Sequence, residues 1–366
     1  MSGIQLNGRF LTRAPTGVDR SAAELMRAIG ELDIAGDVVG DIVLPRGAKL
    51  WQEDEEKPMH RGWNLRQAGP AGLTGHLWEQ AVLPFAAGRG TLLNFCSTAP
   101  LLRRDQAVMI HDAQVWDVPE TFSAQFVAAY RALLPMAARI SRHVLTVSEF
   151  SRRRLEHHRV VPEGKAVVVH NGADHMDRIS ADKDVLARHG LKPGSYFFAL
   201  GSLARHKNLR TVIEARRKCG KDFPLLIVAG GGNARVFADT GLELAADEGR
   251  YIGRVTDAEL KALYQGAIAF VFPSITEGFG LPPVEAMRCS CPVIATTGGA
   301  IPEICGDAAI LVDPHSAGEW AQAMRRIAGS QDMRAKLISQ GRARAGQFTW
   351  SEAARRIVNT LGLPLG

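Results

Sequence analysis

The sequence has 366 residues, of which 46% are hydrophobic and 22% are charged, and its formal net charge is +6. Because one hydrophobic core rarely serves a chain of this length, two domains are expected, and the composition excludes an extensively disordered protein. The positive charge favours anionic partners such as phosphorylated metabolites or anionic lipid surfaces. Nucleic acid is not expected as a partner, since basic and acidic residues are interspersed and no zinc-binding spacing or RNA-binding aromatic signature is present.

The cysteines and the apolar runs indicate the compartment. Five cysteines are an odd number and form no disulfide framework for a chain of this size, which indicates a reducing environment. The first residues, MSGIQLNGRFLTR, lack the continuous apolar core of a secretory signal. No stretch approaches about 18 uninterrupted apolar residues, so no membrane span is expected. We therefore expect a cytoplasmic protein.

Short apolar runs alternate with amphipathic stretches, a pattern typical of parallel sheets covered by helices. In the first half the predicted strands are 41–44, 90–95, 107–111, 143–147 and 166–169, and the predicted helices are 20–30, 123–138 and 149–156. In the second half the predicted strands are 195–200, 224–228, 250–252, 267–272, 292–295 and 309–312, and the predicted helices are 208–217, 257–266, 317–328 and 351–361. The charged segment 172–193 between the halves contains one predicted helix, 182–189.

This pattern predicts an α/β protein with two doubly wound, Rossmann-like domains, residues 1–175 and 176–349. In such sheets ligands bind beyond the carboxyl ends of the strands. The default site of a two-domain protein is the cleft between its domains. Residues that directly follow predicted strands are therefore the first candidates for a functional site.

In the first domain, VMIHDAQVWDVPE places His111 and Asp112 at the end of a predicted strand. A single histidine is more often structural than functional, but the carboxyl end of a strand at a cleft favours function. In HVLTVSEFSRRRL, Ser148 follows the next strand as the predicted N-cap of a helix. The densest basic cluster runs from Arg131 to Arg159 and fits either a solvated helix face or a membrane-facing patch.

The second domain begins with FFALGSLARHKNLRTVIEA. Gly201 follows the first predicted strand, and Arg205 and Lys207 stand before a helix whose predicted N-cap is Asn208. Two cations beside a helix N-terminus suit a pyrophosphate, because arginine can donate two parallel hydrogen bonds to a phosphate and lysine acts as a point charge. A basic surface loop is the alternative.

Two further loops of this domain contain glycine. LLIVAGGGNARVF runs into Gly230–Gly232, but the GxGxxG spacing of a dinucleotide-binding loop fails, so a loop bordering the site and a purely structural turn stay equally open. In RYIGRVTDAELKALY, the loop of Gly253, Arg254 and Val255 either presents backbone groups to a nucleobase edge or simply connects a strand to a helix.

The stretch FVFPSITEGFGLPPVEAM places Glu277 and Glu285 eight positions apart around a glycine-rich turn. Pro273 ends the preceding strand, and a helix is predicted from Leu281 because Pro282 and Pro283 are tolerated in a first turn. Exposed N–H groups at a helix start favour anionic or oxygen-rich ligands, and the glycines allow a ligand to lie against the main chain. A strand-to-helix turn with an acidic first helical turn is the structural alternative.

Taken in order, these segments resemble the retaining glycosyltransferases of family 4, which have the two-domain GT-B fold. The resemblance covers about Val108 to Trp350 and is closest to bacterial mannosyltransferases of surface polysaccharide synthesis. It is strongest in GSLARHKNL, YIGRVTDAEL and PSITEGFGLPPVEAMRCSCPVIATTGGAIPEICGDAAILVDP. It implies that two Rossmann-like domains face each other across a cleft, the first binding the acceptor and the second the nucleotide sugar. It also implies that the last helix, residues 350–366, crosses back to the first domain.

The resemblance also implies roles for single residues. Arg205 and Lys207 would bind the donor diphosphate, Glu277 the hydroxyls of the transferred sugar, and Glu285 the ribose. His111 would approach the donor sugar from the first domain. The remaining donor-site positions implied are Gly201, Gly253, Arg254, Val255, Gly278, Phe279, Gly280 and Leu281. An acceptor or phosphate loop would involve Gly17, Asp112 and Ser148.

Two positions depart from the family pattern. Gly17 in APTGVDR stands alone where many members have a glycine pair, and Ser290 stands where glycine is usual, which we interpret as a packing variation. No metal or other cofactor is implied, because the cationic clamp neutralises the leaving group.

The function expected from this resemblance is transfer of a hexose, with retention, to an acceptor hydroxyl. Mannose or a related sugar from a GDP-sugar is favoured, and a UDP-sugar is the alternative. The expected acceptor is a lipid-linked oligosaccharide of surface polysaccharide or lipopolysaccharide synthesis, with the enzyme at the inner face of the cytoplasmic membrane through Arg131–Arg159. Two further functions compete with transfer: a sugar-nucleotide epimerase of the same fold and a non-catalytic nucleotide-sugar-binding subunit. The lysine pattern of a phosphorylase is missing, and the oligomeric state stays open.

Overall fold

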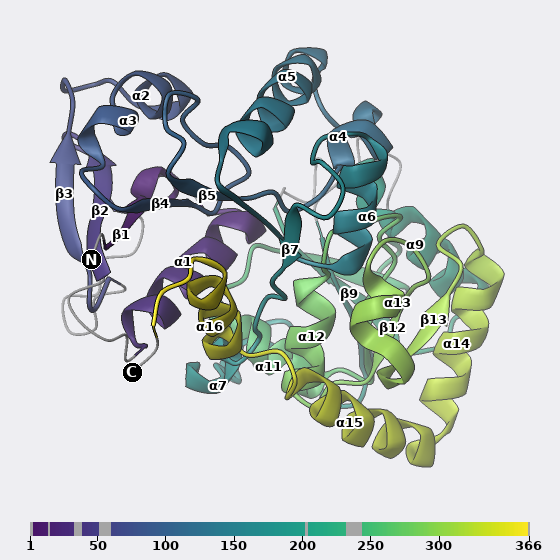
Figure 1. Cartoon of the computed structure of the whole chain (residues 1–366). Helices are drawn as coiled ribbons and strands as arrows, with labels where there is room; N and C mark the ends of the chain where they lie inside the picture. Colours follow the sequence, from purple (N-terminus) through teal and green to yellow (C-terminus); the bar gives the residue numbers. More distant parts are fainter. Residues whose placement is uncertain are drawn as a thin grey trace. The chain divides into compact units, whose positions relative to one another are not determined.

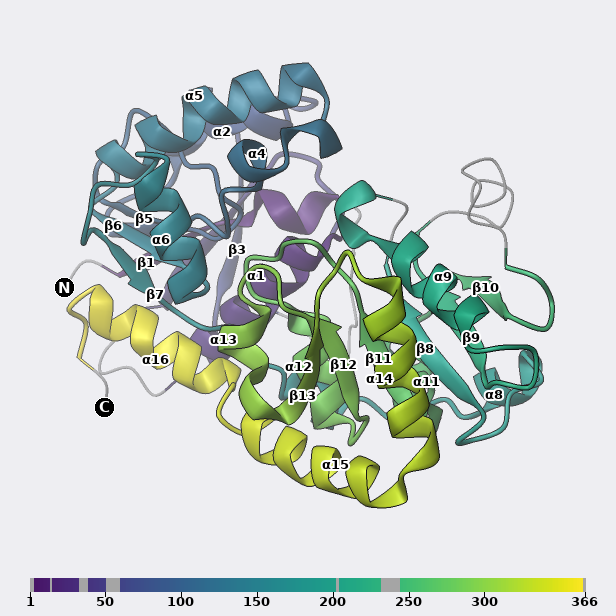
Figure 2. The same ribbon diagram turned by 90° about the vertical axis from the view of Figure 1, so that its right-hand side faces the viewer.

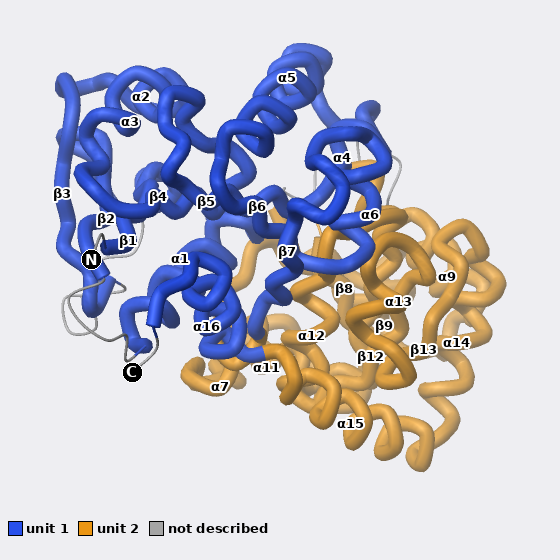
Figure 3. Tube along the Cα trace, in the orientation of Figure 1, with its two compact units in different colours: residues 1–172, 349–366 blue, residues 173–348 orange. Residues whose placement is uncertain are grey.

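The computed structural model describes residues 3–13, 15–32, 39–50, 60–201, 204–231 and 244–364. The chain divides into two compact units, shown in Figure 3. Unit 1 comprises residues 1–172 and 349–366, and unit 2 comprises residues 173–348. These limits lie within a few residues of the domain limits expected from the sequence. Gly232, the last glycine of the run after the second strand of unit 2, lies outside the described residues.

Unit 1 contains a parallel sheet in the order β3-β2-β1-β4-β5-β6-β7. Its strands are β1 (Ile4–Asn7), β2 (Val39–Pro45), β3 (Asn64–Ala68), β4 (Thr91–Asn94), β5 (Gln106–Met109), β6 (His143–Thr146) and β7 (Ala166–Val168). Its α-helices are α1 (Gly17–Gly30), α2 (Gly75–Ala81), α3 (Leu83–Ala86), α4 (Gln114–Asp117), α5 (Ala124–Ile140), α6 (Glu149–His157) and α16 (Trp350–Thr360). Two 3₁₀ turns, η1 (Gly8–Thr12) and η2 (Pro119–Thr121), complete it. The strand order reverses between β1 and β4, the place where doubly wound sheets bind ligands.

Helices cover both faces of this sheet. In Figure 1, α2, α3 and α5 lie on one side of the strands, and α1 and α16 lie on the other. Helix α16 packs against α1, and Arg356 of α16 donates a hydrogen bond to the carbonyl of Val168 at the end of β7. The last helix therefore belongs to unit 1, as the family resemblance implied. Its amphipathic face explains this, since Trp350, Ala354 and Ile357 are buried.

Unit 2 repeats the doubly wound plan, with a parallel sheet in the order β10-β9-β8-β11-β12-β13. Its strands are β8 (Tyr196–Leu200), β9 (Leu225–Ala229), β10 (Gly249–Gly253), β11 (Ala269–Phe272), β12 (Val293–Thr296) and β13 (Ala309–Val312). Its α-helices are α7 (His175–Arg178), α8 (Asp184–Arg188), α9 (Leu209–Lys218), α11 (Asp257–Gly266), α12 (Leu281–Arg288), α13 (Ile301–Cys305), α14 (Ala317–Gly329) and α15 (Gln331–Ala345). The 3₁₀ turns η3 (Arg205–Lys207) and η4 (Gly306–Ala308) follow β8 and α13. Here the strand order reverses between β8 and β11.

Alternating side chains of β8 build the two cores of unit 2. Phe197 packs with α9 and α14 in one buried cluster. Phe198 points to the opposite face, where its ring meets Tyr264 of α11 at a centroid distance of 5.5 Å. This period of two is what a strand buried on both faces requires. The loops that contain the candidate residues of unit 2 follow the carboxyl ends of the strands of this sheet.

The sequence did not predict strands β1 and β3 or helices α2, α3, α4, α7, α13 and α15. Strand β1 is only four residues long, and the edge strand β3 is mostly exposed, so neither shows an apolar pattern. Helix α15, which runs along the lower edge of unit 2 in Figure 2 and packs on α12, is polar around most of its circumference. Within the described ranges, no helix combines the length and apolar character that crossing a membrane requires.

Candidate functional site

The carboxyl ends of β8 and β11 bring two charged motifs together. The turn η3, with Arg205 and Lys207, follows β8, and Glu277 follows β11, the neighbouring strand. Lys207 Nζ lies 2.7 Å from Glu277 Oε1, and their side chains are 26% and 13% exposed. The same ammonium lies 5.9 Å from the centroid of the Phe272 ring, at the last position of β11. A charge-assisted hydrogen bond therefore stands at the strand-order reversal of unit 2.

Backbone contacts hold Glu277 in place. Gly299 has a φ of +64°, and a Cβ there would lie 2.4 Å from the Glu277 nitrogen. The N–H of Ala300 donates to the Glu277 carbonyl at 3.0 Å, and the N–H of Ile275 donates to the His206 carbonyl at 2.7 Å. The loops after β8, β11 and β12 are thus joined through their main chains. Such fixation preorganises a charged side chain for a ligand.

Asn208 makes contacts to the loops near Glu277 that the sequence did not predict. It is the N-cap residue of α9, as predicted, but its side chain makes no capping hydrogen bond to the backbone of the helix. Its φ is +52°, and its Nδ2 group donates to the carbonyls of Pro273 at 3.1 Å and Pro314 at 2.6 Å. Its Nδ2 group thus binds the loops after β11 and β13, while its Oδ1 accepts from the Thr211 hydroxyl in the first turn of α9 at 2.8 Å.

The two other residues of η3 differ in their surroundings. Arg205 is exposed, and its guanidinium has no partner among the residues that the structure describes. His206, which sequence reasoning passed over, is partly buried, and its Nδ1 has no hydrogen-bond partner. Burial and the neighbouring Lys207 lower the pKa of His206, although Glu277 opposes the shift. A neutral imidazole nitrogen and a free guanidinium therefore flank the Lys207–Glu277 pair.

The helix start after Glu277 forms as predicted, with Pro282 and Pro283 in the first turn of α12. At Gly280, however, the space that a Cβ would take is filled by Ile301. The φ of Gly280 is +90°, and a Cβ there would lie 2.2 Å from Cδ1 of Ile301. Glycine is needed at this position for the backbone conformation and for packing, which corrects the expectation that its missing Cβ exposes the main chain. The first turn of α12 also contains no acidic residue, so the structural alternative of an acidic first helical turn is wrong.

Glu285 lies deeper than Glu277 and is only 5% exposed. His175 Nε2 lies 3.1 Å from its Oε1, and the Tyr264 hydroxyl donates to its Oε2 at 3.4 Å. Burial raises the pKa of Tyr264, with Glu285 adding to the shift, so the phenol keeps its proton and can donate. His175 and Tyr264 were missed because neither residue stands beside the motif in the sequence. The role of Glu285 toward a ribose stays a prediction.

Glycines line the carboxyl ends of β8, β9 and β10. A Cβ at Gly230 would lie 2.0 Å from the Gly201 carbonyl oxygen, and the Gly230 N–H donates to the Gly253 carbonyl at 2.9 Å. Close approach of neighbouring strand ends therefore requires Gly230, which favours the structural interpretation of that residue. Gly253 has a φ of +78° with open space beside it, and Arg254 is exposed. The nucleobase contact predicted for Gly253, Arg254 and Val255 stays a prediction.

Four of the candidate residues belong to unit 1. His111 follows β5, is 7% exposed, and its Nε2 donates to the Phe95 carbonyl at 2.7 Å. Burial lowers the pKa of His111, which the Phe95 carbonyl and Asp19 only partly oppose. Asp112 accepts from the Gln114 N–H at 3.0 Å. The side chain of Ser148 accepts from the Ser151 N–H, so Ser148 is the N-cap of α6 as predicted.

Gly17, the fourth residue, begins α1. It is exposed, and a Cβ there would have nothing within 4 Å. The first turn of α1 is closed by Thr16 and Asp19, which bond reciprocally as a capping box. Glycine is therefore not required at this position by packing, and its predicted role beside a phosphate or acceptor stays a prediction.

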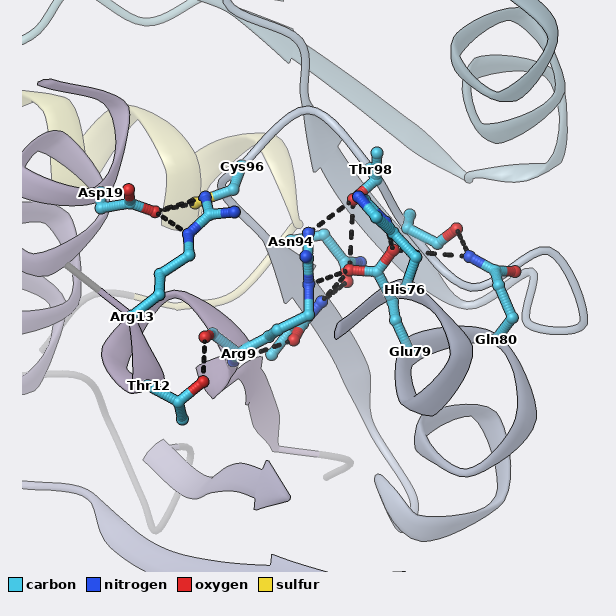
Figure 4. A network of polar contacts seen from close by, with 12 residues as sticks. Arg9, Thr12, Arg13, Asp19, His76, Glu79, Gln80, Asn94, Cys96 and Thr98 are labelled. Carbon is cyan, nitrogen blue, oxygen red and sulfur yellow. Dashed lines mark hydrogen bonds and ion pairs between the residues drawn. The ribbon is translucent and has the colours of Figure 1, made fainter. Parts of the chain in front are cut away.

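A buried polar network that the sequence did not reveal lies at the carboxyl ends of β1 and β4 (Figure 4). Arg9 Nε donates to Glu79 Oε2 at 2.9 Å, and Arg9 Nη2 donates to Thr98 at 3.0 Å. Beside it, Arg13 Nη2 donates to Asp19 Oδ1 at 2.6 Å. The residues of this network come from separate stretches of the sequence, so no local motif indicates that they meet.

Two arginines of the Arg131–Arg159 cluster are held in ion pairs, and its membrane role stays a prediction. Arg152 pairs with Glu149, and Arg154 pairs with Asp117. The exposed arginines of the range are Arg131, Arg139, Arg142, Arg153 and Arg159.

Comparison with known proteins identifies the fold and the C-terminal domain. Residues 185–344 match the family model described as Glycosyl transferases group 1. The O-antigen chain mannosyltransferase RfbU of Salmonella typhimurium is 31% identical over 233 residues, which cover 63% of this chain and 62% of that protein. The O-antigen chain mannosyltransferase B of Escherichia coli is 28% identical over 271 residues, 71% of each chain. The chain thus spans less than two thirds of the Salmonella relative's length.

Solved structures extend the fold similarity to nearly the whole chain. Anabaena HepE in complex with UDP-glucose superposes with a TM-score of 0.74 at 18% identity, over 99% of this chain and 100% of that one. WaaG, a glycosyltransferase involved in lipopolysaccharide biosynthesis, gives a TM-score of 0.70 at 14% identity, over 97% of this chain and 98% of that one. The GT-B fold expected from the family resemblance is confirmed.

Proposed function

Because residues 185–344 are a glycosyl transferases group 1 domain, we propose that the protein is a retaining hexosyltransferase that uses a nucleoside diphosphate sugar. The observation that supports this most is the Lys207–Glu277 pair, 2.7 Å apart, at the carboxyl ends of β8 and β11. A cation for the diphosphate and a carboxylate for sugar hydroxyls are the two functions that a donor site needs. The two side chains that could supply these functions lie side by side, where main-chain hydrogen bonds join the loops after β8, β11 and β12.

In the proposed reaction, the acceptor oxygen forms a bond to the anomeric carbon while the bond from that carbon to the diphosphate breaks. Negative charge develops on the leaving diphosphate, where Lys207 and the exposed Arg205 stabilise it. This proposal needs no metal ion or other cofactor, since the two cations neutralise the leaving group. Attack occurs on the face that the diphosphate leaves, and the leaving phosphate takes the acceptor proton. Glu277 then positions the sugar and is not a general base.

For the donor, we propose mannose or a related hexose carried by GDP. Support comes from the two O-antigen chain mannosyltransferases among the relatives. The alternative is a UDP-sugar, because HepE, which shares the fold, is known in complex with UDP-glucose. A thermal-shift panel of GDP-mannose, UDP-glucose and a dTDP-sugar separates the two, since a ligand of the native state raises the melting temperature. Stabilisation by UDP-glucose alone would overturn the GDP assignment.

Turnover tests the activity itself. Purified full-length protein incubated with GDP-mannose and a membrane extract containing lipid-linked oligosaccharides should release GDP in step with acceptor glycosylation. GDP release of equal size without any acceptor would favour the epimerase-like function. Binding without any GDP release would favour the non-catalytic binding subunit.

For the acceptor, we propose a lipid-linked oligosaccharide, reached from a membrane surface. Phe85 on α3 and Leu102 are 75% and 72% exposed. Arg103 donates to the carbonyls of Pro84 and Gly88, which joins the Leu102 segment to α3. Arg104 follows Leu102 by two residues, and the Arg142 N–H donates to the Arg104 carbonyl at 3.1 Å, so the backbones of two exposed arginines lie near the Leu102 segment. Exposed apolar side chains beside arginines suit an anionic bilayer.

Liposome flotation tests this surface. The Arg104→Glu/Arg142→Glu protein should lose most binding to vesicles containing anionic phosphatidylglycerol. The matched control is Lys336→Glu, an exposed residue of α15, which should bind as the unaltered protein does. Arg152 and Arg154 are unsuitable for this test because their ion pairs with Glu149 and Asp117 would be broken as well. Undiminished binding of the Arg104→Glu/Arg142→Glu protein would remove the membrane role of this surface.

A further inference from the structure

Unit 2 contains a pocket of about 390 Å³ at the amino ends of three neighbouring strands. Gly194 lies two residues before β8, Ile268 directly precedes β11, and Pro292 directly precedes β12. The first turns of α15, the helix along the lower edge of unit 2 in Figure 2, form another wall. The volume falls within the range of about 300–1,000 Å³ that is usual for small-molecule sites. We call this site the amino-edge pocket.

The amino-edge pocket is separate from the candidate donor site. Lys207 and Glu277 follow β8 and β11, whereas the pocket lies before the same two strands. Strand β11 has four residues, and at about 3.3 Å per residue it holds its two ends about 13 Å apart. A ligand in the amino-edge pocket would therefore not use the side chains proposed for the donor diphosphate.

Arg334 of α15 gives the amino-edge pocket a positive charge. Its Nη1 donates to the carbonyls of Ile327 and Ala328, in the last turn of α14, at 2.7 and 2.8 Å. Its Nε and Nη2 have no hydrogen-bond partner among the residues that the structure describes. None of the residues that line the pocket is acidic. Because one edge of a guanidinium can donate two parallel hydrogen bonds, this anchored arginine suits a phosphate.

Three neutral polar side chains complete the lining. The amides of Gln265 and Gln331 are exposed and make no side-chain hydrogen bond within the described part of the chain. The Ser290 Oγ accepts from Arg342 Nε at 2.7 Å, which leaves the serine proton available for donation. Amides and hydroxyls both donate and accept hydrogen bonds, as the hydroxyls of a sugar do.

The rest of the lining narrows the class of ligand. Ile268, Pro292 and Ile338 supply an apolar wall on which the C–H groups of a sugar ring can pack. No lining residue is aromatic, so a nucleobase would find no ring to stack on. A metal cation would find no carboxylate. The combination of one cation, three neutral polar groups and an apolar wall fits a small phosphorylated polyol.

The backbone at Ser290 agrees with a function for its side chain. Its φ is +64°, a conformation that strains every residue except glycine. Glycine would remove this strain but also the hydroxyl that lines the amino-edge pocket. A ligand contact would explain why serine is kept at this position.

We propose that the amino-edge pocket binds a sugar phosphate, with the phosphate on Arg334 and the sugar hydroxyls on Gln265, Ser290 and Gln331. This site goes beyond the proposed function and does not depend on it, because the candidate donor site lies at the opposite edge of the sheet.

Isothermal titration of the full-length protein with glucose 6-phosphate, free glucose and inorganic phosphate tests the site. Glucose 6-phosphate should bind more tightly than either of its parts, because only the whole ligand contacts both Arg334 and the neutral groups. The Lys207→Gln protein, whose donor site has lost a cation, should bind glucose 6-phosphate as the unaltered protein does. This comparison separates the amino-edge pocket from the donor site whatever the donor is.

Two substitutions probe the two halves of the ligand. Arg334→Met should weaken binding of glucose 6-phosphate by about tenfold to a hundredfold, because a charged hydrogen bond is lost. Lys336→Met is the matched control: it removes one positive charge from the same helix but lies outside the lining, and it should leave the affinity unchanged. Ser290→Gly should weaken binding about threefold to tenfold without loss of stability, since its φ suits glycine.

The other outcomes contradict the proposal. Absence of glucose 6-phosphate binding would overturn it, as would binding that Lys207→Gln abolishes or that Lys336→Met weakens as much as Arg334→Met does. Inorganic phosphate that binds as tightly as glucose 6-phosphate would exclude a sugar subsite, and equally tight free glucose would exclude an anion site. Because Arg334 also bonds the end of α14, Arg334→Met could unfold the protein. Ser290→Gly and Gln265→Ala then decide, and unchanged affinity of both would refute the site.

Discussion

Lys207 Nζ and Glu277 Oε1 lie 2.7 Å apart although the two residues are 70 positions apart in the sequence. The contact exists because β8 and β11 are neighbours in the sheet and each residue follows one of these strands. Each side chain fixes the position of the other at the carboxyl edge of the sheet, where the proposed donor would bind. The pair thus links the strand order of unit 2 to the proposed chemistry.

Substitution of Lys207 and substitution of Glu277 should impair catalysis in different ways. Lys207→Gln should lower the turnover number by about 10²–10³ because the developing charge on the diphosphate loses its cation. Glu277→Gln should keep donor affinity and lose most turnover, since it disturbs the position of the sugar. Isothermal titration with donor and steady-state kinetics separate the two effects. Unchanged turnover of Glu277→Gln would refute its positioning role.

A double-mutant cycle on the same pair measures their coupling. The Lys207→Gln/Glu277→Gln protein should lose less activity than the two single changes would give together, because both remove one shared contact. Strict additivity would mean that the two side chains act independently. Arg217→Gln, whose ion pair with Glu248 lies elsewhere in unit 2, is the control that should leave turnover unchanged.

Gly280→Ala should destabilise the fold around the site. A non-glycine residue at a φ of +90° is strained by about 1–2 kcal/mol, and its Cβ would also meet Ile301 Cδ1. Urea unfolding should show a lower free energy of unfolding for this variant. Gly318→Ala, in the first turn of α14 with nothing within 4 Å, should equal or exceed the unaltered protein. Equal stability of the Gly280→Ala protein would contradict the role given to Ile301.

Ser290→Gly should stabilise the protein by up to about 1 kcal/mol. The sequence suggested that serine at this position is a packing variation, but its φ of +64° places it in the left-handed region that glycine adopts without strain. Part of the gain is offset because Arg342 Nε loses its 2.7 Å bond to Ser290 Oγ. Ser290→Ala is the matched variant: it loses this bond but keeps the strain, so its unfolding free energy should fall. A Ser290→Gly protein less stable than Ser290→Ala would refute the conformational argument.

His111 should make stability depend on pH below about 6.5, its ordinary pKa. Burial lowers the pKa of the folded imidazole, so in this window the unfolded chain binds a proton that the folded chain does not. The free energy of unfolding therefore falls as the pH falls through the window. His111→Gln keeps an N–H donor for the Phe95 carbonyl and should lose less stability between about pH 7.5 and about pH 5.5. The pKa values of His143 and His206 are also lowered. Because both residues are present in both proteins, their contribution cancels when the pH dependence of one protein's unfolding free energy is subtracted from that of the other.

Much of the fold could be predicted because its signals are local. The strand 309–312 and the helix 257–266 match the structure residue for residue, since an apolar run or an amphipathic period needs no knowledge of neighbours. The spacing of Glu277 and Glu285, and the position of Arg205 and Lys207 after a strand, are local signals too. Helix α15 escaped prediction because its polar circumference has no apolar period, and it is held mainly by packing on α12.

The sequence by itself determined two doubly wound α/β units and the motifs at their strand ends. Only the tertiary structure decided the partners: Lys207 with Glu277, His175 and Tyr264 with Glu285, Arg13 with Asp19, and Ile301 with Gly280. The physical reason is that hydrogen bonds and close packing depend on which strand ends become neighbours. A parallel sheet sets these neighbours by strand order, and strand order is a property of the whole chain.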